Sequence, residues 1–213
     1  RVGVVGAGRV GAVLASRLQR AGFQLVGVSG QSPASLLRIH TLLVDVPVLN
    51  PAQVANAAEI LILAVPDDAL GQVAVELAEH VRSGQLVAHT SGRHGLEVLA
   101  PLAAAGAHPI ALHPAMTFTG TAMDLDRLID CAFGVTADDA LRPMAEALVL
   151  EMGGEPVWVD GADRTTYHLA LAHGANHLVT LTSEAMELLS RAGVPEPRRV
   201  LGPLMRAALD NAL

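Results

Sequence analysis

A glycine-rich run near the start of the chain has the spacing of a phosphate-binding turn. The run Gly6-Ala7-Gly8-Arg9-Val10-Gly11 follows the apolar stretch Val2–Val5 and opens the amphipathic stretch Arg9–Arg20. In such a strand–turn–helix unit the first glycine makes the turn, the second admits a pyrophosphate, and the third allows close helix packing. The helix N-terminus then faces the phosphate charge. The alternative is a plain glycine-rich turn. The residues expected to bind a dinucleotide are Gly6, Ala7, Gly8, Arg9, Val10 and Gly11.

The second expected strand ends without an acidic residue. Sites for NAD usually carry a carboxylate there, which holds the ribose 2′-hydroxyl. Ser29, Gln31 and Ser32 stand at this point instead, and they offer hydrogen-bond donors that do not repel a 2′-phosphate. Arg9 and Arg38 could supply positive charge, so we expect NADP(H) rather than NAD(H). The serines could also cap the next helix, and the two roles are compatible.

Two polar residues close apolar stretches further along the chain. Ser91 follows Leu86–Thr90, and His113 ends Ile110–His113. Because open α/β sheets bind ligands beyond the carboxyl ends of their strands, both side chains could line the cofactor cleft. A neutral imidazole can exchange a proton with a carbonyl or a hydroxyl group. Alternatively, His113 stands in a turn before Pro114, where its ring satisfies backbone groups.

A long helical stretch carries a second polar set. Leu169, His173, Asn176 and Thr180 follow the spacing of one helix face, and because their neighbours are mostly apolar we expect this helix to be largely buried. Buried polar groups need partners, which a substrate, a nicotinamide amide or a hydrogen-bond network at a dimer interface would supply. His173 and His177 lack an adjacent glutamate and a third ligand, so we expect no metal site.

Short apolar runs alternate with amphipathic stretches up to residue 160, a pattern typical of a parallel, doubly wound α/β sheet. Beyond it only helical patterns remain, Thr165–Ala192 and a second helix after a break at residues 194–197. We therefore predict a Rossmann-type domain over residues 1–161 and a smaller all-helical domain over residues 162–213, which we expect to continue beyond the last residue. The predicted strands are Val2–Val5, Phe23–Ser29, Val46–Leu49, Glu59–Val65, Leu86–Thr90, Ile110–His113, Ala132–Thr136 and Pro156–Val159.

Composition excludes several classes of function. Fourteen basic and twenty-one acidic residues give a net charge of −7, the wrong sign for non-specific nucleic-acid binding. The chain has no lysine, which excludes Schiff-base chemistry. Its one cysteine, Cys131, lies in an apolar run and is expected to be a buried hydrophobe. One unpaired cysteine and no apolar run long enough for a membrane span predict a cytoplasmic protein.

Four segments occur in an order that resembles a known family. They are Gly6–Gly11, Ala64-Val65-Pro66-Asp67-Asp68, His89-Thr90-Ser91-Gly92 and Leu112-His113-Pro114-Ala115-Met116-Thr117-Phe118. The chain resembles two-domain, Rossmann-like NADP-dependent oxidoreductases related to prephenate dehydrogenase, pyrroline-5-carboxylate reductase and β-hydroxyacid dehydrogenases. The resemblance implies a helical domain that builds a homodimer and closes the active-site cleft. It also places Val65, Pro66 and Asp67 in the cofactor site.

The resemblance implies roles for four residues. Ser91 and His113 match the serine and histidine that contact substrate in prephenate dehydrogenases. His173 and Asn176 match a Lys-x-x-Asn motif of β-hydroxyacid dehydrogenases, with histidine in place of the lysine. We expect hydride transfer to or from a small carbonyl, hydroxy-acid or imine substrate with His113, Ser91, His173 and Asn176 as the catalytic set. The alternative is a non-catalytic NADP(H)-binding sensor or scaffold.

Overall fold

Contacts in the computed structural model, which describes residues 1–213, divide the chain into two units, Arg1–Tyr167 and His168–Leu213. The sequence pattern changes near residue 161. The division falls a few residues later, inside the long helix α8 (Arg164–Arg191), so the first turn of that helix belongs to the first unit. The two units are described in turn.

The first unit contains one seven-stranded sheet with the order β2-β1-β3-β4-β5-β6-β7. Its central strands are short runs of Val, Leu, Ile and Ala that are buried on both faces, as in a parallel sheet covered by helices. The strands are β1 (Val2–Val5), β2 (Leu25–Ser29), β3 (Ile60–Leu63), β4 (Leu86–His89), β5 (His108–Pro114), β6 (Ala132–Ala137) and β7 (Glu155–Trp158).

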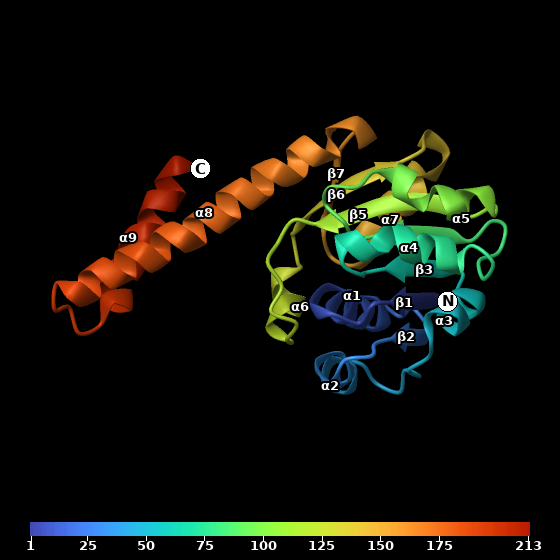
Figure 1. The fold of residues 1–213 in the computed structure, drawn as a ribbon, viewed down its shortest axis with the longest axis horizontal. Coiled ribbons are helices and arrows are strands. Elements are labelled where there is room, and N and C mark those ends of the chain that lie inside the picture. Colours follow the sequence, from blue (N-terminus) through green and yellow to red (C-terminus); the bar gives the residue numbers. More distant parts are fainter. The chain divides into compact units, whose positions relative to one another are not determined.

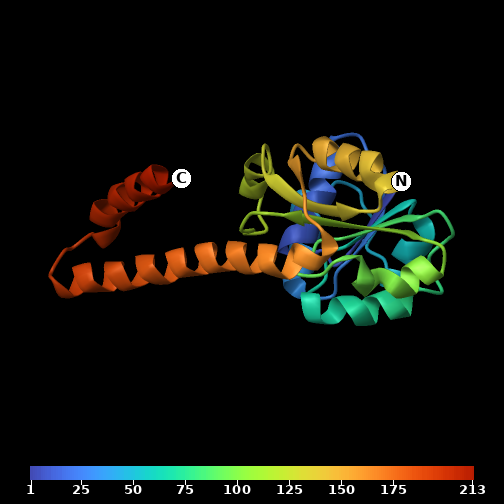
Figure 2. The ribbon, with the colours of Figure 1, turned by 90° about the horizontal axis from the view of Figure 1, so that it is seen from above.

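Helices cover both faces of this sheet (Figures 1 and 2). One face packs against α1 (Arg9–Arg20), α2 (Pro33–Leu42) and α7 (Arg142–Glu151). The other packs against α3 (Pro51–Ala57), α4 (Asp67–Leu77) and α5 (Ala100–Ala104). Each face has its own cluster of buried aliphatic side chains. The predicted Rossmann-type, doubly wound architecture is therefore confirmed, as is the helical region that follows it.

Local sequence sets where α2 and α3 begin. Each has a polar N-cap residue followed by proline at the first helical position. Proline fits there because its fixed φ is helical and because an N–H at this position would have no partner within the helix. The Ser32 hydroxyl accepts a hydrogen bond from the Ser35 amide at 3.1 Å. The expected capping role of Ser32 is therefore present.

The direction of β6 differs from the prediction of an all-parallel sheet. β6 pairs antiparallel with β5, whereas β6 and β7 are parallel to each other and joined through α7. A parallel return needs a long crossover, usually a helix that packs on the sheet. Residues 115–131 contain only the short helix α6 (Met123–Arg127), so the chain turns back on itself.

Two further elements differ from the sequence expectation. The strand expected at Val46–Leu49 is reduced to a single bridge between Val48 and Val28 of β2. The short helix α5, which follows a 3-10 turn over Leu96–Leu99, was not predicted. Both are short, and short elements give little periodic signal.

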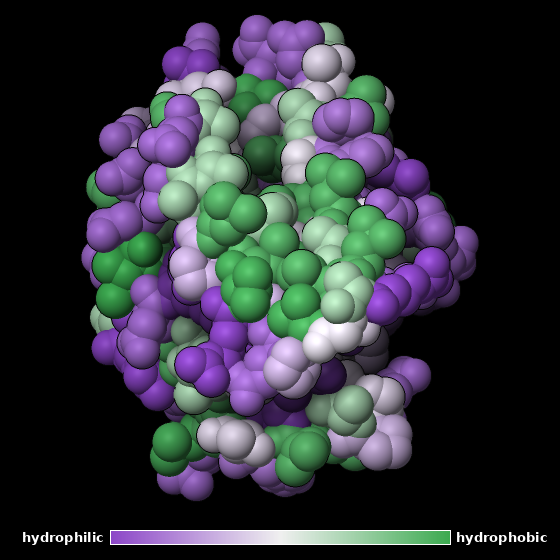
Figure 3. Space-filling model, turned by 90° about the vertical axis from the view of Figure 1, so that its left-hand side faces the viewer, coloured by the Kyte–Doolittle hydropathy of each residue, from purple (hydrophilic) through white to green (hydrophobic).

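The second unit consists of α8 from His168 onward and α9 (Pro197–Ala212). No helix of the chain is both long and apolar enough to cross a membrane. Apolar residues at the surface of the protein gather into green areas in Figure 3. The predicted homodimer stays a prediction, and the observation behind it is the exposed apolar set of this unit: Leu169, Leu171, Leu178, Val179, Leu181, Leu188, Val200, Leu204, Leu209 and Leu213.

Candidate functional site

Strand register brings the predicted residues of the first unit to one edge of the sheet. Ser29, Val5, Leu63, His89 and Ala111 are paired in a single row across β2, β1, β3, β4 and β5. These strands are parallel, so the segments that follow this row all emerge on the same side. This edge is the carboxyl end of the sheet, where open α/β folds bind ligands.

The glycine turn after β1 is closed on two sides and open on the third. Gly6 has φ +94°, and a Cβ atom there would lie 2.6 Å from the Ala64 carbonyl oxygen. A Cβ atom on Gly11 would overlap the Gly6 carbonyl oxygen, so α1 can approach the turn only through glycine. A Cβ atom on Gly8 would meet nothing within 4 Å. Gly8 is the N-cap of α1, and no side chain caps that helix. The turn therefore offers backbone amides and open space, as a bound pyrophosphate requires.

The predicted residues after β2 have different surroundings. Ser29 is buried, and its hydroxyl accepts a hydrogen bond from the Gly6 amide at 3.1 Å. It therefore ties the end of β2 to the glycine turn. Gln31 and Ser32 are exposed at the start of α2. No carboxylate follows the strand.

Two arginines meet beside a loop that follows β5. A Cβ atom on Gly120 would lie 2.6 Å from Arg38 Nε and 3.1 Å from Arg9 Cγ, so both side chains pack against this loop. The buried carboxylate of Asp124 accepts hydrogen bonds from the amides of Thr119, at 2.8 Å, and Gly120, at 2.7 Å. Neither Arg9 nor Arg38 takes part in an ion pair. Two uncompensated positive charges are thus held next to the start of α1.

The segment after β3 leads into α4. Pro66 is the N-cap of this helix, and Asp67 lies in its first turn, where the helix dipole favours a carboxylate. Val65 packs against the apolar cluster of the α3–α4 face. Arg93, in the loop after β4, pairs with Asp67 at 3.5 Å and with Asp68 at 2.9 Å. This contact links the loops that follow β3 and β4.

Ser91 is held by hydrogen bonds at three of its groups. Its amide donates to His89 Nδ1 at 3.2 Å, and its hydroxyl accepts from the His94 amide at 3.3 Å. Its carbonyl accepts a 2.6 Å hydrogen bond from Arg164. The loop that presents Ser91 therefore has a defined position at the end of β4.

His89 supports this loop as a neutral residue. It is fully buried, and burial lowers its pKa from 6.5 to about 4, with a smaller contribution from the Arg164 charge. Nδ1 accepts a hydrogen bond from the Ser91 amide, so Nε2 carries the ring proton and donates to the Gly95 carbonyl at 3.0 Å. The His89 ring therefore holds the loop after β4 in place, a role that the segment His89-Thr90-Ser91-Gly92 did not predict.

Arg164 was missed by the sequence reasoning. It is fully buried in the first turn of α8, and no carboxylate lies within ion-pair distance. Its guanidinium donates to the Ser91 carbonyl, to the Gly134 carbonyl at 3.3 Å and to the Thr136 hydroxyl at 3.0 Å, while Nε has no partner. The sequence pattern predicts that a single arginine at the start of a helix is exposed to solvent. No sequence signal indicates that Arg164 is buried.

His113 is paired with the only tyrosine in the chain. Its Nδ1 lies 3.0 Å from the Tyr167 hydroxyl, and the two rings meet edge to face. Tyr167 covers Gly134, the register partner of His113 on β6, where a Cβ atom would lie 2.5 Å from the hydroxyl oxygen. Burial raises the pKa of Tyr167, while the charge of Arg164 and the backbone of Gly134 lower it. His113 thus belongs to a side-chain group rather than to an isolated turn.

His173 and Asn176 lie on α8 in the second unit, where both are exposed. The His173 carbonyl is hydrogen bonded to His177 Nδ1 at 2.7 Å, and the Asn176 carbonyl accepts from the Thr180 hydroxyl at 3.1 Å. The expectation that this stretch is largely buried does not hold within the unit, because α9 covers only part of α8. The substrate contacts expected of His173 and Asn176 stay predictions.

Cys131 is half-buried rather than fully buried, because it precedes β6 at the end of the sheet. Burial raises its pKa, so the thiol stays protonated at neutral pH. Nowhere in the chain do three or more His, Cys, Asp or Glu side chains gather in a way that could hold a metal ion.

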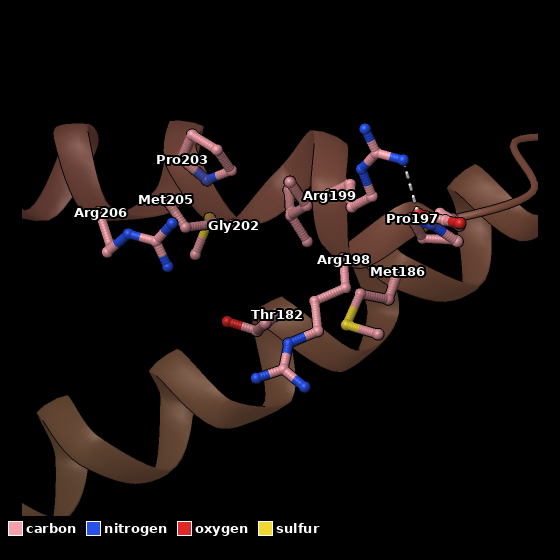
Figure 4. Close-up of a pocket in the computed structure, with 11 residues that line it drawn as sticks. Thr182, Met186, Pro197, Arg198, Arg199, Gly202, Pro203, Met205 and Arg206 are labelled. Carbon is pink, nitrogen blue, oxygen red and sulfur yellow. Dashed lines mark hydrogen bonds and ion pairs between the residues drawn. The ribbon is translucent and has the colours of Figure 1, made fainter.

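The second unit contains a separate hollow of about 1000 Å³ between α8 and α9 (Figure 4). Arg198 and Arg206 reach from α9 toward α8, whereas Arg199 points away and pairs with Glu196 at 3.1 Å. Thr182 and other α8 residues form the opposite wall. None of the predicted site residues lines this hollow.

Comparisons with protein families match both parts of the chain. Residues 1–114 match the model of a Rossmann-like domain, and residues 131–213 match a domain of unknown function called DUF2520. No curated protein sequence matches the chain.

Solved structures with the same fold come from several organisms. A Bacteroides fragilis protein described as a "putative NADP oxidoreductase" is 22% identical with a TM-score of 0.81, over 99% of this chain and 79% of its own. Plasmodium falciparum pyrroline carboxylate reductase, solved with NADP bound, is 14% identical with a TM-score of 0.72, over 99% and 76%. Salmonella typhimurium 3-hydroxyisobutyrate dehydrogenase is 19% identical with a TM-score of 0.73, over 91% and 68%. At these identities the likeness shows the shared fold.

The buried neutral state of His89 predicts a pH-dependent stability. The unfolded chain binds a proton at His89 near pH 6.5, whereas the folded protein binds it only near pH 4. Between these values the unfolded state holds more protons, so the free energy of unfolding falls as the pH is lowered. The contribution lost over this window is roughly 3 kcal/mol. Denaturant unfolding of wild type and His89→Gln at several pH values measures it, and the same pH dependence in both proteins would contradict the assignment.

Proposed function

Because the chain belongs to the Rossmann-like domain family and continues into a DUF2520 domain, we propose that it is an NADP(H)-dependent oxidoreductase. Its reaction is hydride transfer to or from a small carbonyl, hydroxy-acid or imine substrate. One observation carries the proposal: the open glycine turn and His113, which is hydrogen bonded to Tyr167, follow the same row of the sheet. The names of the neighbouring structures, among them reductases and dehydrogenases, support the same class.

The residues of the glycine turn fit a dinucleotide. The uncapped N-terminus of α1 faces the open side of Gly8, so the pyrophosphate would bind to backbone amides there. Val65, Pro66 and Asp67 form the next loop along the edge and would contact the bound cofactor beside the turn. The dinucleotide supplies or accepts the hydride, and the chain binds it, orients it and excludes water.

The surroundings of β2 favour a 2′-phosphate. A carboxylate, which would repel a phosphate, is absent there. Arg9 and Arg38 bring two unpaired charges to the loop around Gly120, and Gln31 and Ser32 add exposed hydrogen-bond donors. Charge-assisted hydrogen bonds from arginine are the strong contacts of phosphate sites.

The substrate would lie toward β4 and β5. These strands are two and three places from β1, or roughly 10 to 14 Å from the glycine turn at the usual strand spacing. Ser91 and His113 stand at their ends, so the nicotinamide end of the cofactor would reach them. Ser91 would hold the carboxamide or a substrate oxygen, and His113 would orient the substrate and exchange a proton with it.

A non-catalytic NADP(H) sensor is the second candidate. Histidine at position 173, where related dehydrogenases are expected to have a lysine, is the residue that favours it. An assay of NADPH oxidation with a panel of carbonyl and imine compounds separates the two candidates. Turnover of at least one compound supports the enzyme, whereas cofactor binding without turnover supports the sensor.

Gly8→Val tests the phosphate site. The added side chain fills the space that a pyrophosphate would occupy, so we expect affinity for NADPH and NADH to fall on the order of 100-fold. The fold is expected to stay intact, because a Cβ atom there meets no other atom within 4 Å. Titration calorimetry measures binding, and Gly174→Val, at an equally open glycine in the second unit, is the matched control. Unchanged affinity in folded Gly8→Val would place the phosphate site elsewhere.

Arg9→Gln and Arg38→Gln test the cofactor preference. Wild type is expected to bind NADPH more tightly than NADH, and each variant is expected to lose about 10-fold in NADPH affinity with little change for NADH. Arg20→Gln, at the exposed far end of α1, controls for net charge. NADH binding as tight as NADPH binding in wild type, or equal losses for both cofactors, would refute the preference.

A further inference from the structure

Three side chains beside the end of β5 form one connected group. Tyr167 Oη lies 3.0 Å from His113 Nδ1, and the guanidinium carbon of Arg164 lies 6.0 Å from the centre of the Tyr167 ring. His113 comes from β5, while Arg164 and Tyr167 come from the first turn of α8. A hydroxyl, an imidazole and a cation are therefore aligned where the sheet presents its ligand-binding edge.

The cation in this group makes no ion pair, although the charges of Glu97 and Asp67 act on it from beyond ion-pair distance. Arg164 is fully buried, and its hydrogen bonds go to the carbonyls of Ser91 and Gly134 and to the hydroxyl of Thr136, all of them neutral. Its Nε has no partner. Burying an unpaired charge is costly, and it stabilises any negative charge that develops nearby. The group that can develop such a charge beside it is the Tyr167 hydroxyl.

We propose that Tyr167 is the proton source of the reaction, that His113 relays its proton to the substrate oxygen, and that Arg164 is a positioning residue that stabilises the resulting phenolate. This inference rests on the proposed function. The proposal takes Tyr167 Oη as the hydrogen-bond donor and His113 Nδ1 as the acceptor, which requires the imidazole tautomer with its proton on Nε2. The backbone of Gly134 also favours the ionised phenol.

The step balances for a carbonyl substrate. A reduced dinucleotide bound at the sheet edge would supply the hydride, whose electron pair forms the new C–H bond while the π pair of the C=O bond moves to the oxygen. That oxygen takes the proton from His113 Nε2, while Nδ1 takes the proton from Tyr167 Oη. The O–H bond pair stays on the phenolate beside Arg164. Water then returns a proton to His113 Nε2, and Nδ1 gives its proton back to the phenolate, which restores both side chains. In the oxidative direction each transfer is reversed.

The charged and titratable groups around Tyr167 define the effect of each substitution. Arg164 on α8 lowers the pKa of Tyr167, whereas burial and Cys131 raise it, and His113 is its hydrogen-bond partner from β5. His89 on β4 stays neutral near Arg164. Loss of the Arg164 charge therefore raises the pKa of Tyr167.

The single tyrosine allows this to be measured without substrate. The ultraviolet absorbance of tyrosinate, followed against pH, reports Tyr167 alone. In Arg164→Gln we expect the midpoint to rise by about one pH unit, the size of one nearby charge in a partly buried site. Arg164→Lys should restore most of the wild-type midpoint, and Arg20→Gln should leave it unchanged. Equal midpoints in wild type and folded Arg164→Gln overturn the role of Arg164. If Arg164→Gln does not fold, the test rests on Arg164→Lys. A tyrosinate midpoint in Arg164→Lys that lies about one pH unit above that of wild type overturns the role of Arg164.

Turnover separates the two proposals. Tyr167→Phe is expected to bind NADPH normally and to lose on the order of 10²- to 10⁴-fold in kcat, the usual size of a positioned proton donor. Wild-type kcat should fall as the pH rises through the Tyr167 midpoint, and Tyr167→Phe should lack this dependence. An active wild type with an equally active Tyr167→Phe refutes the proton source alone. A wild type that binds NADPH and turns over no carbonyl or imine refutes the proposed function itself, even where Tyr167 titrates as expected.

Discussion

In the parallel part of the sheet, β1, β3, β4 and β5 are paired so that Val5, Leu63, His89 and Ala111 form one row. The segments that form the candidate site follow this row. The glycine turn fixes the phosphate end, because α1 can pack only where Gly6 and Gly11 lack side chains. The register then sets how far the reacting groups lie from that turn. Backbone pairing therefore sets the positions of the residues that we propose to bind cofactor and substrate.

Buried polar contacts hold the other end of this edge. Arg164 joins the loop after β4 to β6 through the carbonyls of Ser91 and Gly134, although the two strands are separated by β5. The neutral ring of His89 is hydrogen bonded to the Ser91 amide and the Gly95 carbonyl of the same loop. Such contacts are costly when incomplete, and the unpaired charge of Arg164 is maintained by the surrounding fold. In the proposed relay, this charge is what would stabilise the Tyr167 phenolate after its proton has left.

The local parts of the structure could be predicted from the sequence, whereas the long-range parts could not. The turn Gly6–Gly11 and the helix after it follow from glycine spacing and hydrophobic period, and both are present as expected. The reversal at β6 depends on how residues 115–131 pack, which their pattern does not encode. Tyr167 meets His113 across 54 positions, and Arg164 meets Ser91 across 73. No periodicity marks such pairs, so two residues of the candidate site emerge only from the folded structure.

The central claim is that one sheet edge binds NADP(H) with its pyrophosphate at Gly8 and its nicotinamide near β4 and β5. A crystal structure of the protein soaked or grown with NADPH tests this most directly. The account predicts phosphate density against the amides at the start of α1, a 2′-phosphate contacted by Arg9 or Arg38, and the nicotinamide next to Ser91 and His113. A dinucleotide bound at any other surface, or one whose nicotinamide lies away from the ends of β4 and β5, would contradict it.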